Sequence, residues 1–120
     1  MDLGLQDKII IVTGGAKGIG EGISRVLAAE GALPVIVGRS EEDNSNTVQA
    51  IQAAGGKADS VAAELTMPDA CKKAVAYVSE KYGRIDGLVN NAGVNDGVGL
   101  ANGNYEDFIR SLHRNVVHYT

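Results

Sequence analysis

The chain has 120 residues, of which 44% are hydrophobic and 22% charged, and its formal net charge is −4. This composition is typical of one globular domain, and an acidic chain without a basic run is poorly suited to binding nucleic acid. The single cysteine excludes an internal disulfide, which fits a reducing cytoplasm. No segment has the pattern of a secretory signal or a membrane span, so we expect a cytoplasmic protein without a membrane partner.

The first predicted unit is a strand followed by a helix. The run KIIIVT at residues 8–13 is apolar and β-branched, as in strands that are buried on both faces. The helix should begin near Gly18 and stop at Gly31, because glycine commonly follows a helix C-terminus. Its inner face is predicted at Ile19, Ile23, Val26 and Leu27.

The second unit repeats this order. Residues 33–38 (LPVIVG) predict a strand. Ser40, with Asp43 three residues later, resembles a capping box and should start the second helix, which Gly55 and Gly56 should end. The inner face of this helix is predicted at Val48 and Ile51.

The remaining units have weaker signals. Residues 58–64 predict a third strand, and residues 86–90 predict a fourth. Thr66 and Asp69 should open a third helix, which Gly83 closes. The apolar stripe of that helix is predicted at Cys71, Ala74, Val75, Val78 and Tyr82.

The order of these elements predicts the α/β class. A loop rich in Gly and Asn follows the fourth strand, and one or two helical segments are expected from about Tyr105. Strands that alternate with helices form parallel sheets with right-handed crossovers and with helices on both faces. No repeat or linker divides the sequence, so residues 1–120 are expected to belong to one domain.

The segment TGGAKGIG at residues 13–20 connects the first strand to the first helix. Gly14, Gly18 and Gly20 are spaced to permit a sharp turn and to let the backbone approach a phosphate at the helix N-terminus. The same glycines also fit an ordinary strand–helix turn. The strand before the loop and the helix after it favour the phosphate site.

A second motif, NNAG at residues 90–93, ends the fourth strand. TGxxxGxG and NNAG together resemble the classical short-chain dehydrogenase/reductase family, of which the chain covers the N-terminal half. The resemblance implies a Rossmann-type sheet with strand order 3-2-1-4 here, incomplete relative to the family fold. It also implies hydride transfer between NAD or NADP and a small-molecule alcohol or carbonyl, in an enzyme that forms homo-oligomers.

The resemblance further implies which residues hold the coenzyme. Those around the pyrophosphate and the adenosine ribose are Gly14, Ala16, Lys17, Gly18, Ile19 and Gly20. Glu64, followed by Leu65, stands at the adenine contact, where the family usually has Asp and where the longer side chain changes the reach. Those beside the cofactor ribose are Asn91, Ala92 and Gly93. Asn90 is expected to tie the fourth strand into the sheet.

The residues after the second strand favour NADP over NAD. NAD-specific relatives usually place Asp there to bind the ribose 2′-hydroxyl, but this chain has Gly38 followed by Arg39. No carboxylate at that position repels a phosphate, so we expect NADP. Arg39 should be the main residue that binds its 2′-phosphate, with Ser40 and Lys17 assisting. NAD is the alternative coenzyme, and the alternative role for Arg39 and Lys17 is that of ordinary solvated cations.

The proton-transfer groups of the family are a Ser and a Tyr-x-x-x-Lys pair that follow NNAG. No such pair follows NNAG here, so the 120 residues alone are expected to be inactive. Tyr77–Lys81 (YVSEK) fits the letters, but it precedes NNAG and is predicted on the solvent flank of the third helix, so we reject it. Asn115 matches a family asparagine that helps to hold a water in the proton relay; the alternative is a helix-interior Asn bonded to nearby backbone. No ligand cluster predicts a metal site.

The substrate side is expected at the loop after NNAG, where Asn95 and Asp96 suit a sugar or another polyol. The run NNAGVNDGVGL resembles bacterial L-fucose-type sugar dehydrogenases of the family. Two other functions stay open: a dinucleotide-binding module without catalysis, and a flavodoxin-like module with a fortuitous glycine loop. A chain that ended at Thr120 would leave the fourth strand as a bare sheet edge, and we expect such a chain to self-associate or to be poorly stable.

Overall fold

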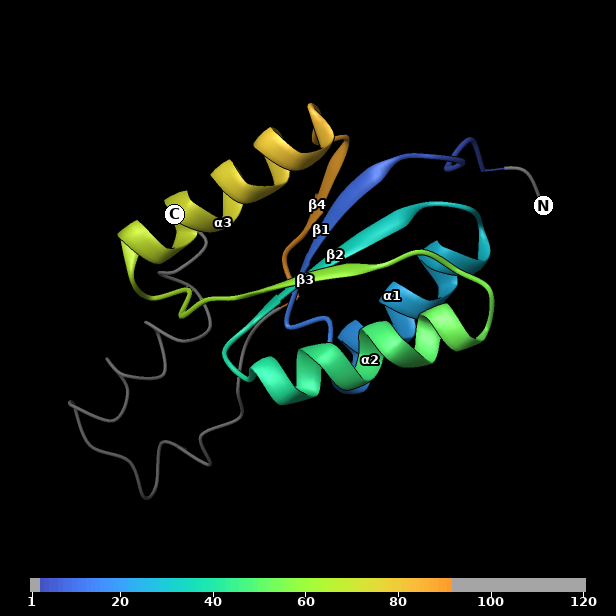
Figure 1. The fold of residues 1–120 in the computed structure, drawn as a ribbon, viewed down its shortest axis with the longest axis horizontal. Helices are drawn as coiled ribbons and strands as arrows, with labels where there is room; N and C mark the ends of the chain where they lie inside the picture. Colours follow the sequence, from blue (N-terminus) through green and yellow to red (C-terminus); the bar gives the residue numbers. More distant parts are fainter. Residues whose placement is uncertain (1–2, 92–120) are drawn as a thin grey trace, which may run out of the picture.

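Strands and helices alternate along residues 3–91, the part of the chain that the structure, a computed structural model, describes (Figure 1). The strands are β1 (Ile9–Thr13), β2 (Leu33–Gly38), β3 (Asp59–Ala62) and β4 (Gly87–Val89). The helices are α1 (Gly18–Ala29), α2 (Glu41–Ala53) and α3 (Pro68–Tyr82). The elements predicted up to residue 90 are thus confirmed, with β3 and β4 shorter than expected. The helical segments expected from Tyr105 lie outside the described residues.

The four strands form one parallel sheet in the expected order, β3-β2-β1-β4. In this register, Ile11 of β1 lies between Val35 of β2 and Leu88 of β4. Every residue of β1 is buried, which explains its continuous run of β-branched side chains. Because all strands run the same way, the loops that follow them gather at one edge of the sheet, which we call the carboxyl edge. The opposite edge, where the strands begin, we call the amino edge.

Helices cover both faces of the sheet, with α3 on one face and α1 and α2 on the other (Figure 1). Alternate residues of β1 point to opposite faces and enter two apolar clusters. The cluster beneath α3 includes Ile9, Ile11, Val35, Val37, Ala74 and Val78. The cluster on the side of α1 includes Ile10, Val12, Ile23 and Leu27. The expected α/β architecture with helices on both faces is therefore confirmed.

The predicted inner face of α1 is wrong at two positions. Ile19 is 78% exposed and Val26 is 59% exposed. The buried residues of this helix are instead the small ones, namely Gly20, Ser24 and Ala28. Small side chains let the helix axis approach the sheet closely, so the contact face of α1 does not coincide with its most hydrophobic stripe.

The predicted start of α2 is confirmed, because the Asp43 N–H donates to the Ser40 hydroxyl oxygen at 3.2 Å. Ile51 is buried as expected, whereas Val48 is only partly buried. The rest of the buried face is polar and consists of Asn44 and Thr47. Hydrophobic periodicity does not predict these two residues, whose hydrogen bonds join the loops of the carboxyl edge.

The predicted cap of α3 is wrong. Met67 is the N-cap residue and makes no side-chain hydrogen bond, and Pro68 occupies the first turn, where its missing N–H costs nothing. The Thr66 hydroxyl donates instead to the Glu64 carboxylate at 3.2 Å. Gly83 ends the helix in the left-handed conformation, as expected. Of the predicted stripe, Ala74 and Val78 are buried, Cys71 and Tyr82 are partly buried and Val75 is exposed.

Candidate functional site

The loop between β1 and α1 makes its turn at two glycines. Gly14 has φ 64° and Gly18 has φ 54°, a region that residues with a Cβ rarely adopt. The Gly14 N–H donates to the Val37 carbonyl at 2.8 Å, so the chain leaves the sheet directly after this last bond to β2. The backbone conformation therefore requires glycine at two positions of the motif.

The third motif glycine, Gly20, lies where the loop folds back against the first turn of α1. A Cβ on Gly20 would collide with the carbonyl oxygen of Gly14. The buried Ser24 hydroxyl lies 2.9 Å from the Gly20 carbonyl oxygen and 3.2 Å from that of Gly15, and it bonds the helix to the loop. Sequence reasoning missed Ser24, although its position four residues after Gly20 on a helix is a signal for such a backbone bond.

The N-terminus of α1 lies at the carboxyl edge without a side-chain cap. Its N-cap residue, Lys17, has an extended backbone and makes no side-chain hydrogen bond to the first turn. The first-turn backbone N–H groups of residues 18–20 lie at the positive end of the helix dipole. Uncapped donors, a positive helix end and a glycine backbone that allows close approach are the features of a phosphate site.

One network joins the glycine loop to the end of β4. The Asn91 N–H donates to the Thr13 hydroxyl oxygen at 3.0 Å, and the Asn91 side-chain amide donates to the Gly14 carbonyl at 3.2 Å. The Thr13 hydroxyl in turn donates to the Val89 carbonyl at 3.2 Å. The tie that we expected from Asn90 is therefore made by Asn91, while Asn90 is exposed. Thr13 and Gly14 of the first motif and Asn91 of the second thus belong to one hydrogen-bonded network.

A second pair of contacts joins α2 to the same edge. The Thr47 hydroxyl donates to the Ala16 carbonyl of the glycine loop at 3.0 Å. The Asn44 side chain donates to the Gly38 carbonyl at 3.1 Å, directly before Arg39. These bonds pair partly buried carbonyls, one in the glycine loop and one at the end of β2, and they fix the loop after β1 relative to the end of β2.

The two cations that we expected at a 2′-phosphate each have a carboxylate partner. Lys17 Nζ lies 3.0 Å from Asp43 Oδ2, and Arg39 Nη1 lies 3.7 Å from Glu64 Oε2. The hydrogen bond from the Lys17 ammonium holds the pKa of the Asp43 carboxyl below its usual value, so this group is ionised at neutral pH. Both side chains remain largely exposed, at 76% for Lys17 and 65% for Arg39, so their alternative role as ordinary solvated surface cations stays open.

Only some of the other predicted site residues lie within the described part of the chain. Glu64 follows β3 at the carboxyl edge, where it pairs with Arg39, and Leu65 packs against the apolar cluster beneath α3. Ala92, Gly93 and Asn115 lie outside the described residues, so their roles stay predictions.

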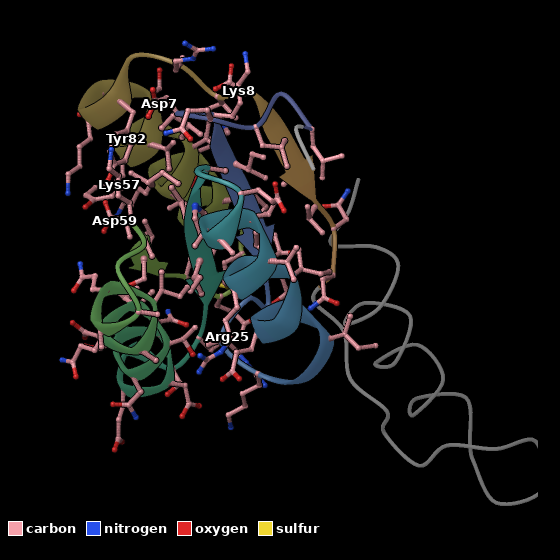
Figure 2. All side chains as sticks on the ribbon, turned by 90° about the vertical axis from the view of Figure 1, so that its right-hand side faces the viewer. Asp7, Lys8, Arg25, Lys57, Asp59 and Tyr82 are labelled. Atoms are coloured by element: carbon pink, nitrogen blue, oxygen red, sulfur yellow. The ribbon has the colours of Figure 1, made fainter. Side chains whose placement is uncertain are left out.

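The rejected pair, Tyr77 and Lys81, lies in a cluster of polar side chains at the amino edge. Lys81 Nζ lies 3.1 Å from the Tyr77 hydroxyl, and both groups donate to Asp59 Oδ2, at 3.0 and 2.9 Å. The Tyr82 hydroxyl donates to the same oxygen at 2.6 Å, and Asp59 and Tyr82 lie together in Figure 2. Burial and then the bond to Asp59 raise the pKa of Tyr82 to about 12. These contacts fasten α3 to β3 at the edge of the sheet away from the glycine loop.

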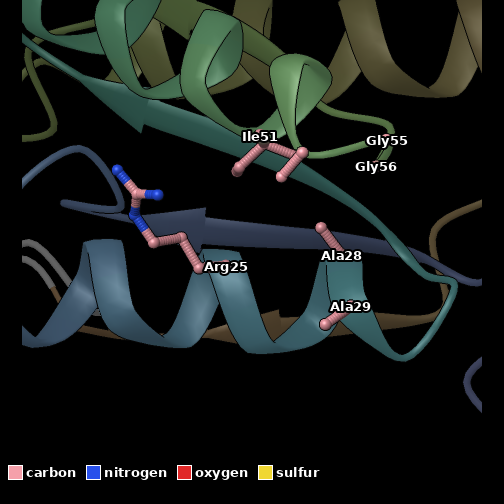
Figure 3. Close-up of a pocket in the computed structure, with 7 residues that line it drawn as sticks. Arg25, Ala28, Ala29, Ile51, Gly55 and Gly56 are labelled. Carbon is pink, nitrogen blue, oxygen red and sulfur yellow. The ribbon is translucent and has the colours of Figure 1, made fainter.

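A small cavity of about 210 Å³ lies between α1 and α2 (Figure 3). Its lining residues are Arg25, Ala28, Ala29, Ile51, Ala54, Gly55 and Gly56. Most of them come from the C-terminal ends of the two helices, so the cavity is separate from the glycine loop. In residues 3–91, no group of three or more His, Cys, Asp or Glu side chains is placed to hold a metal ion. No helix of this part of the chain is long and apolar enough to cross a membrane.

Comparison with known proteins places this geometry in a family. The profile of the family described as short chain dehydrogenase matches residues 8–119. The chain is 43% identical over 90 residues to the short-chain reductase protein NovJ of Streptomyces niveus, covering 75% of this chain and 34% of that protein. It is also 43% identical over 89 residues to a 3beta-hydroxysteroid dehydrogenase of Mediterraneibacter gnavus, covering 74% of this chain and 32% of that protein.

Solved structures agree with the fold. A citronellol catabolism dehydrogenase of Pseudomonas aeruginosa PAO1 superimposes with a TM-score of 0.88 at 38% identity, over 97% of this chain and 48% of that one. A metagenomic short-chain oxidoreductase in complex with NADP gives 0.85 at 34% identity, over 95% and 52%. L-Sorbose reductase of Gluconobacter frateurii, complexed with NADPH and L-sorbose, gives 0.89 at 28% identity, over 99% and 46%. The chain thus spans about a third of the curated relatives and about half of the solved chains.

Proposed function

The chain belongs to the short-chain dehydrogenase family, and from this premise we propose that it forms the coenzyme-binding part of an NADP-preferring oxidoreductase. In this proposal, the enzyme interconverts an alcohol and its carbonyl, with a sugar or another polyol as substrate. The uncapped N-terminus of α1 behind the glycine loop is the observation that carries the proposal. We also propose that the enzyme is a cytoplasmic homo-oligomer, a proposal that rests on the family resemblance alone.

The residues of the carboxyl edge fit a dinucleotide. Because Gly20 has no Cβ, the Gly14 carbonyl can lie close against α1. The first-turn N–H groups of α1 would hold the diphosphate. Asn91 would keep the loop in register with the end of β4, beside the expected path of the cofactor ribose. We assign the coenzyme contacts to Gly14, Ala16, Lys17, Gly18, Ile19, Gly20, Arg39, Ser40, Glu64, Leu65, Asn91, Ala92 and Gly93.

When bound, the nicotinamide ring would accept or supply the hydride. The described residues bind and orient the coenzyme, and none of them is placed to move the accompanying proton. We propose that Asn115 holds a water for that proton, as the family resemblance implies. A Tyr-x-x-x-Lys pair after NNAG is needed for the transfer, and residues 94–120 do not contain it, so we propose that residues 1–120 alone bind coenzyme without turning over substrate.

The NADP preference rests on the residues that follow β2. Gly38 presents no carboxylate to the ribose, and Arg39 has an exposed guanidinium that can exchange Glu64 for a phosphate. Two solved relatives are described as complexes with NADP or NADPH, which supports the same choice. NAD is the second candidate, since it needs only the diphosphate site.

The sugar proposal rests on residues 90–100, which resemble L-fucose-type dehydrogenases, and on the L-sorbose bound to a solved relative. Because residues 1–120 are proposed not to turn over substrate, this part is tested by calorimetric binding of L-fucose to the NADP-saturated protein, compared with binding of a simple secondary alcohol. We expect L-fucose to bind more tightly, and equal or absent binding of both would contradict the sugar proposal.

Calorimetric titration with NADPH and NADH tests the coenzyme part. We expect NADPH to bind about 10-fold or more tightly than NADH, and Arg39→Asp to remove that difference. Lys72→Asp, the matched control on α3, should leave the difference intact, because Lys72 is exposed and forms no ion pair within residues 3–91. Equal binding of NADPH and NADH by the unaltered protein would contradict the NADP preference.

A further inference from the structure

The pair of Lys17 and Asp43 bridges two elements that flank the expected 2′-phosphate position. Lys17 belongs to the glycine loop that precedes α1, and Asp43 belongs to the first turn of α2. Their charged atoms lie 3.0 Å apart, which is the distance of a charge-assisted hydrogen bond. The cation that is expected to assist in reading a phosphate is therefore already bound to an anion of the chain itself.

Asp43 is the better fixed partner of the two. Its N–H donates to the Ser40 cap, and the positive end of α2 favours a carboxylate at this position. Its side chain is 33% exposed, against 76% for the side chain of Lys17. The Lys17 ammonium can therefore leave the Asp43 carboxylate without disturbing α2.

We propose that Asp43 lowers the preference for 2′-phosphorylated coenzyme by holding the Lys17 ammonium that the phosphate would use. This inference rests on the proposed function. A phosphate brings up to two negative charges and three acceptor oxygens, so it can displace one carboxylate from Lys17. The displacement breaks an existing ion pair and leaves two anions close together, whereas a ribose with a free 2′-hydroxyl meets no such competition. Asp43 therefore opposes Lys17 and Arg39 in setting the coenzyme preference.

The chain offers a matched pair of variants for this inference. Asp43→Asn removes the charge that holds Lys17 and keeps the side chain nearly the same size. Glu42→Gln removes the same charge from the neighbouring residue, which is exposed and forms no ion pair within residues 3–91. Any difference between these variants therefore reports the contact with Lys17 and not the net charge of the helix turn.

The probes are adenosine 2′,5′-bisphosphate and 5′-AMP, which differ only in the 2′-phosphate, and calorimetry measures their binding. We expect Asp43→Asn to bind the bisphosphate about 2- to 5-fold more tightly than Glu42→Gln does, which is the range of one exposed ion pair. Binding of 5′-AMP should be the same in both variants. An Asp43→Asn variant that binds the bisphosphate no better than Glu42→Gln would overturn the inference.

A double-mutant cycle shows whether the effect passes through Lys17. In a Lys17→Met background, Asp43→Asn should no longer improve binding of the bisphosphate, and a full improvement there would also overturn the inference. The proposed NADP preference fails separately, if the unaltered protein binds the bisphosphate no better than 5′-AMP. Comparison of the two variants tests Asp43, and comparison of the two probes on the unaltered protein tests the coenzyme preference.

Discussion

The two edges of the sheet differ in whether their hydrogen-bond donors are already bonded within the protein. At the carboxyl edge, the first turn of α1 has no side-chain cap, and its backbone is shaped by glycines for close approach. At the amino edge, the Asp59 carboxylate accepts bonds from two tyrosine hydroxyls, from the Lys81 ammonium and from the Ser60 N–H. The carboxyl edge has backbone N–H donors available for a ligand, whereas the donors around Asp59 at the amino edge are bonded within the protein.

This difference separates a usable motif from a literal one. Tyr77 and Lys81 match the letters of a catalytic pair, and their polar atoms are even in contact. The Lys81 ammonium also pairs with Asp59, at the edge of the sheet away from the glycine loop. The glycine loop departs from the usual GxGxxG spacing, yet it leaves uncapped N–H groups at a helix N-terminus. Whether the donors are already hydrogen-bonded, and not the sequence pattern alone, decides what each edge can bind.

The largest effect is expected from Gly20→Ala at the carboxyl edge. The added methyl group would meet the Gly14 carbonyl, so the loop must move away from α1. We expect coenzyme binding to weaken by about 10-fold or more and the free energy of unfolding to fall by about 1–3 kcal/mol. Calorimetry with NADPH and urea denaturation measure the two effects.

The matched control is Gly22→Ala on the same helix. A Cβ at Gly22 meets no atom within 4 Å. This variant should bind coenzyme normally and should be more stable by up to about 1 kcal/mol, because alanine is the better helix former. Equal losses of binding in the two glycine variants would show that the close approach of the loop to α1 is irrelevant.

Asp59→Asn at the amino edge should give the converse result. The change removes the charge that holds Lys81 and weakens the bonds from both tyrosines, so we expect a loss of about 1–2 kcal/mol in the free energy of unfolding. Coenzyme affinity should not change. Urea denaturation and calorimetry test both parts, with Glu80→Gln, an exposed residue of α3, as the control for charge. A large loss of NADPH binding in Asp59→Asn would break the distinction between the two edges.

A smaller effect is expected from Ser40→Ala, which removes the cap of α2. The Asp43 N–H would lose its acceptor, at a cost of about 1 kcal/mol in thermal or urea denaturation. Because Ser40 is also expected to assist at the 2′-phosphate, NADPH binding should weaken while NADH binding stays the same. A variant of unchanged stability would contradict the observed cap.

The smallest effect concerns the pH dependence of stability at the amino edge. Burial and the bond to Asp59 raise the pKa of Tyr82 to about 12 in the folded protein. The stabilisation that this shift reflects is complete below the ordinary tyrosine value of about 10, and it is lost as pH rises from there toward about 12. Tyr82→Phe should remove this part of the alkaline loss of stability, measured by urea denaturation between about pH 9 and 11. An unchanged alkaline profile would show that the contact with Asp59 contributes nothing.

The order of the elements could be predicted from the sequence because short-range signals determine it. β1 is one continuous β-branched run, and Gly31, Ser40 and Gly83 mark the helix ends as expected. The inner face of α1 could not be predicted this way, because tight packing at Gly20 matters more there than hydrophobic area.

The candidate site could be predicted only in outline. The glycine loop and the end of β4 were both expected to contribute, but the choice of Asn91 over Asn90 as the tie depends on the direction in which each side chain points. The pairing of Lys17 with Asp43 is likewise a tertiary contact between the loop before α1 and the first turn of α2. Sequence spacing alone says nothing about such a contact.

The central claim is that the open first turn of α1 holds the coenzyme, and amide chemical shifts recorded by NMR during titration with NADPH test it most directly. The account predicts saturable shifts at the N–H groups of Gly14, Gly18, Ile19 and Gly20, while Asp59 and Ser60 at the amino edge stay unchanged. A folded protein whose glycine-loop amides do not move at saturating NADPH, or whose shifts occur only at the amino edge, would contradict it.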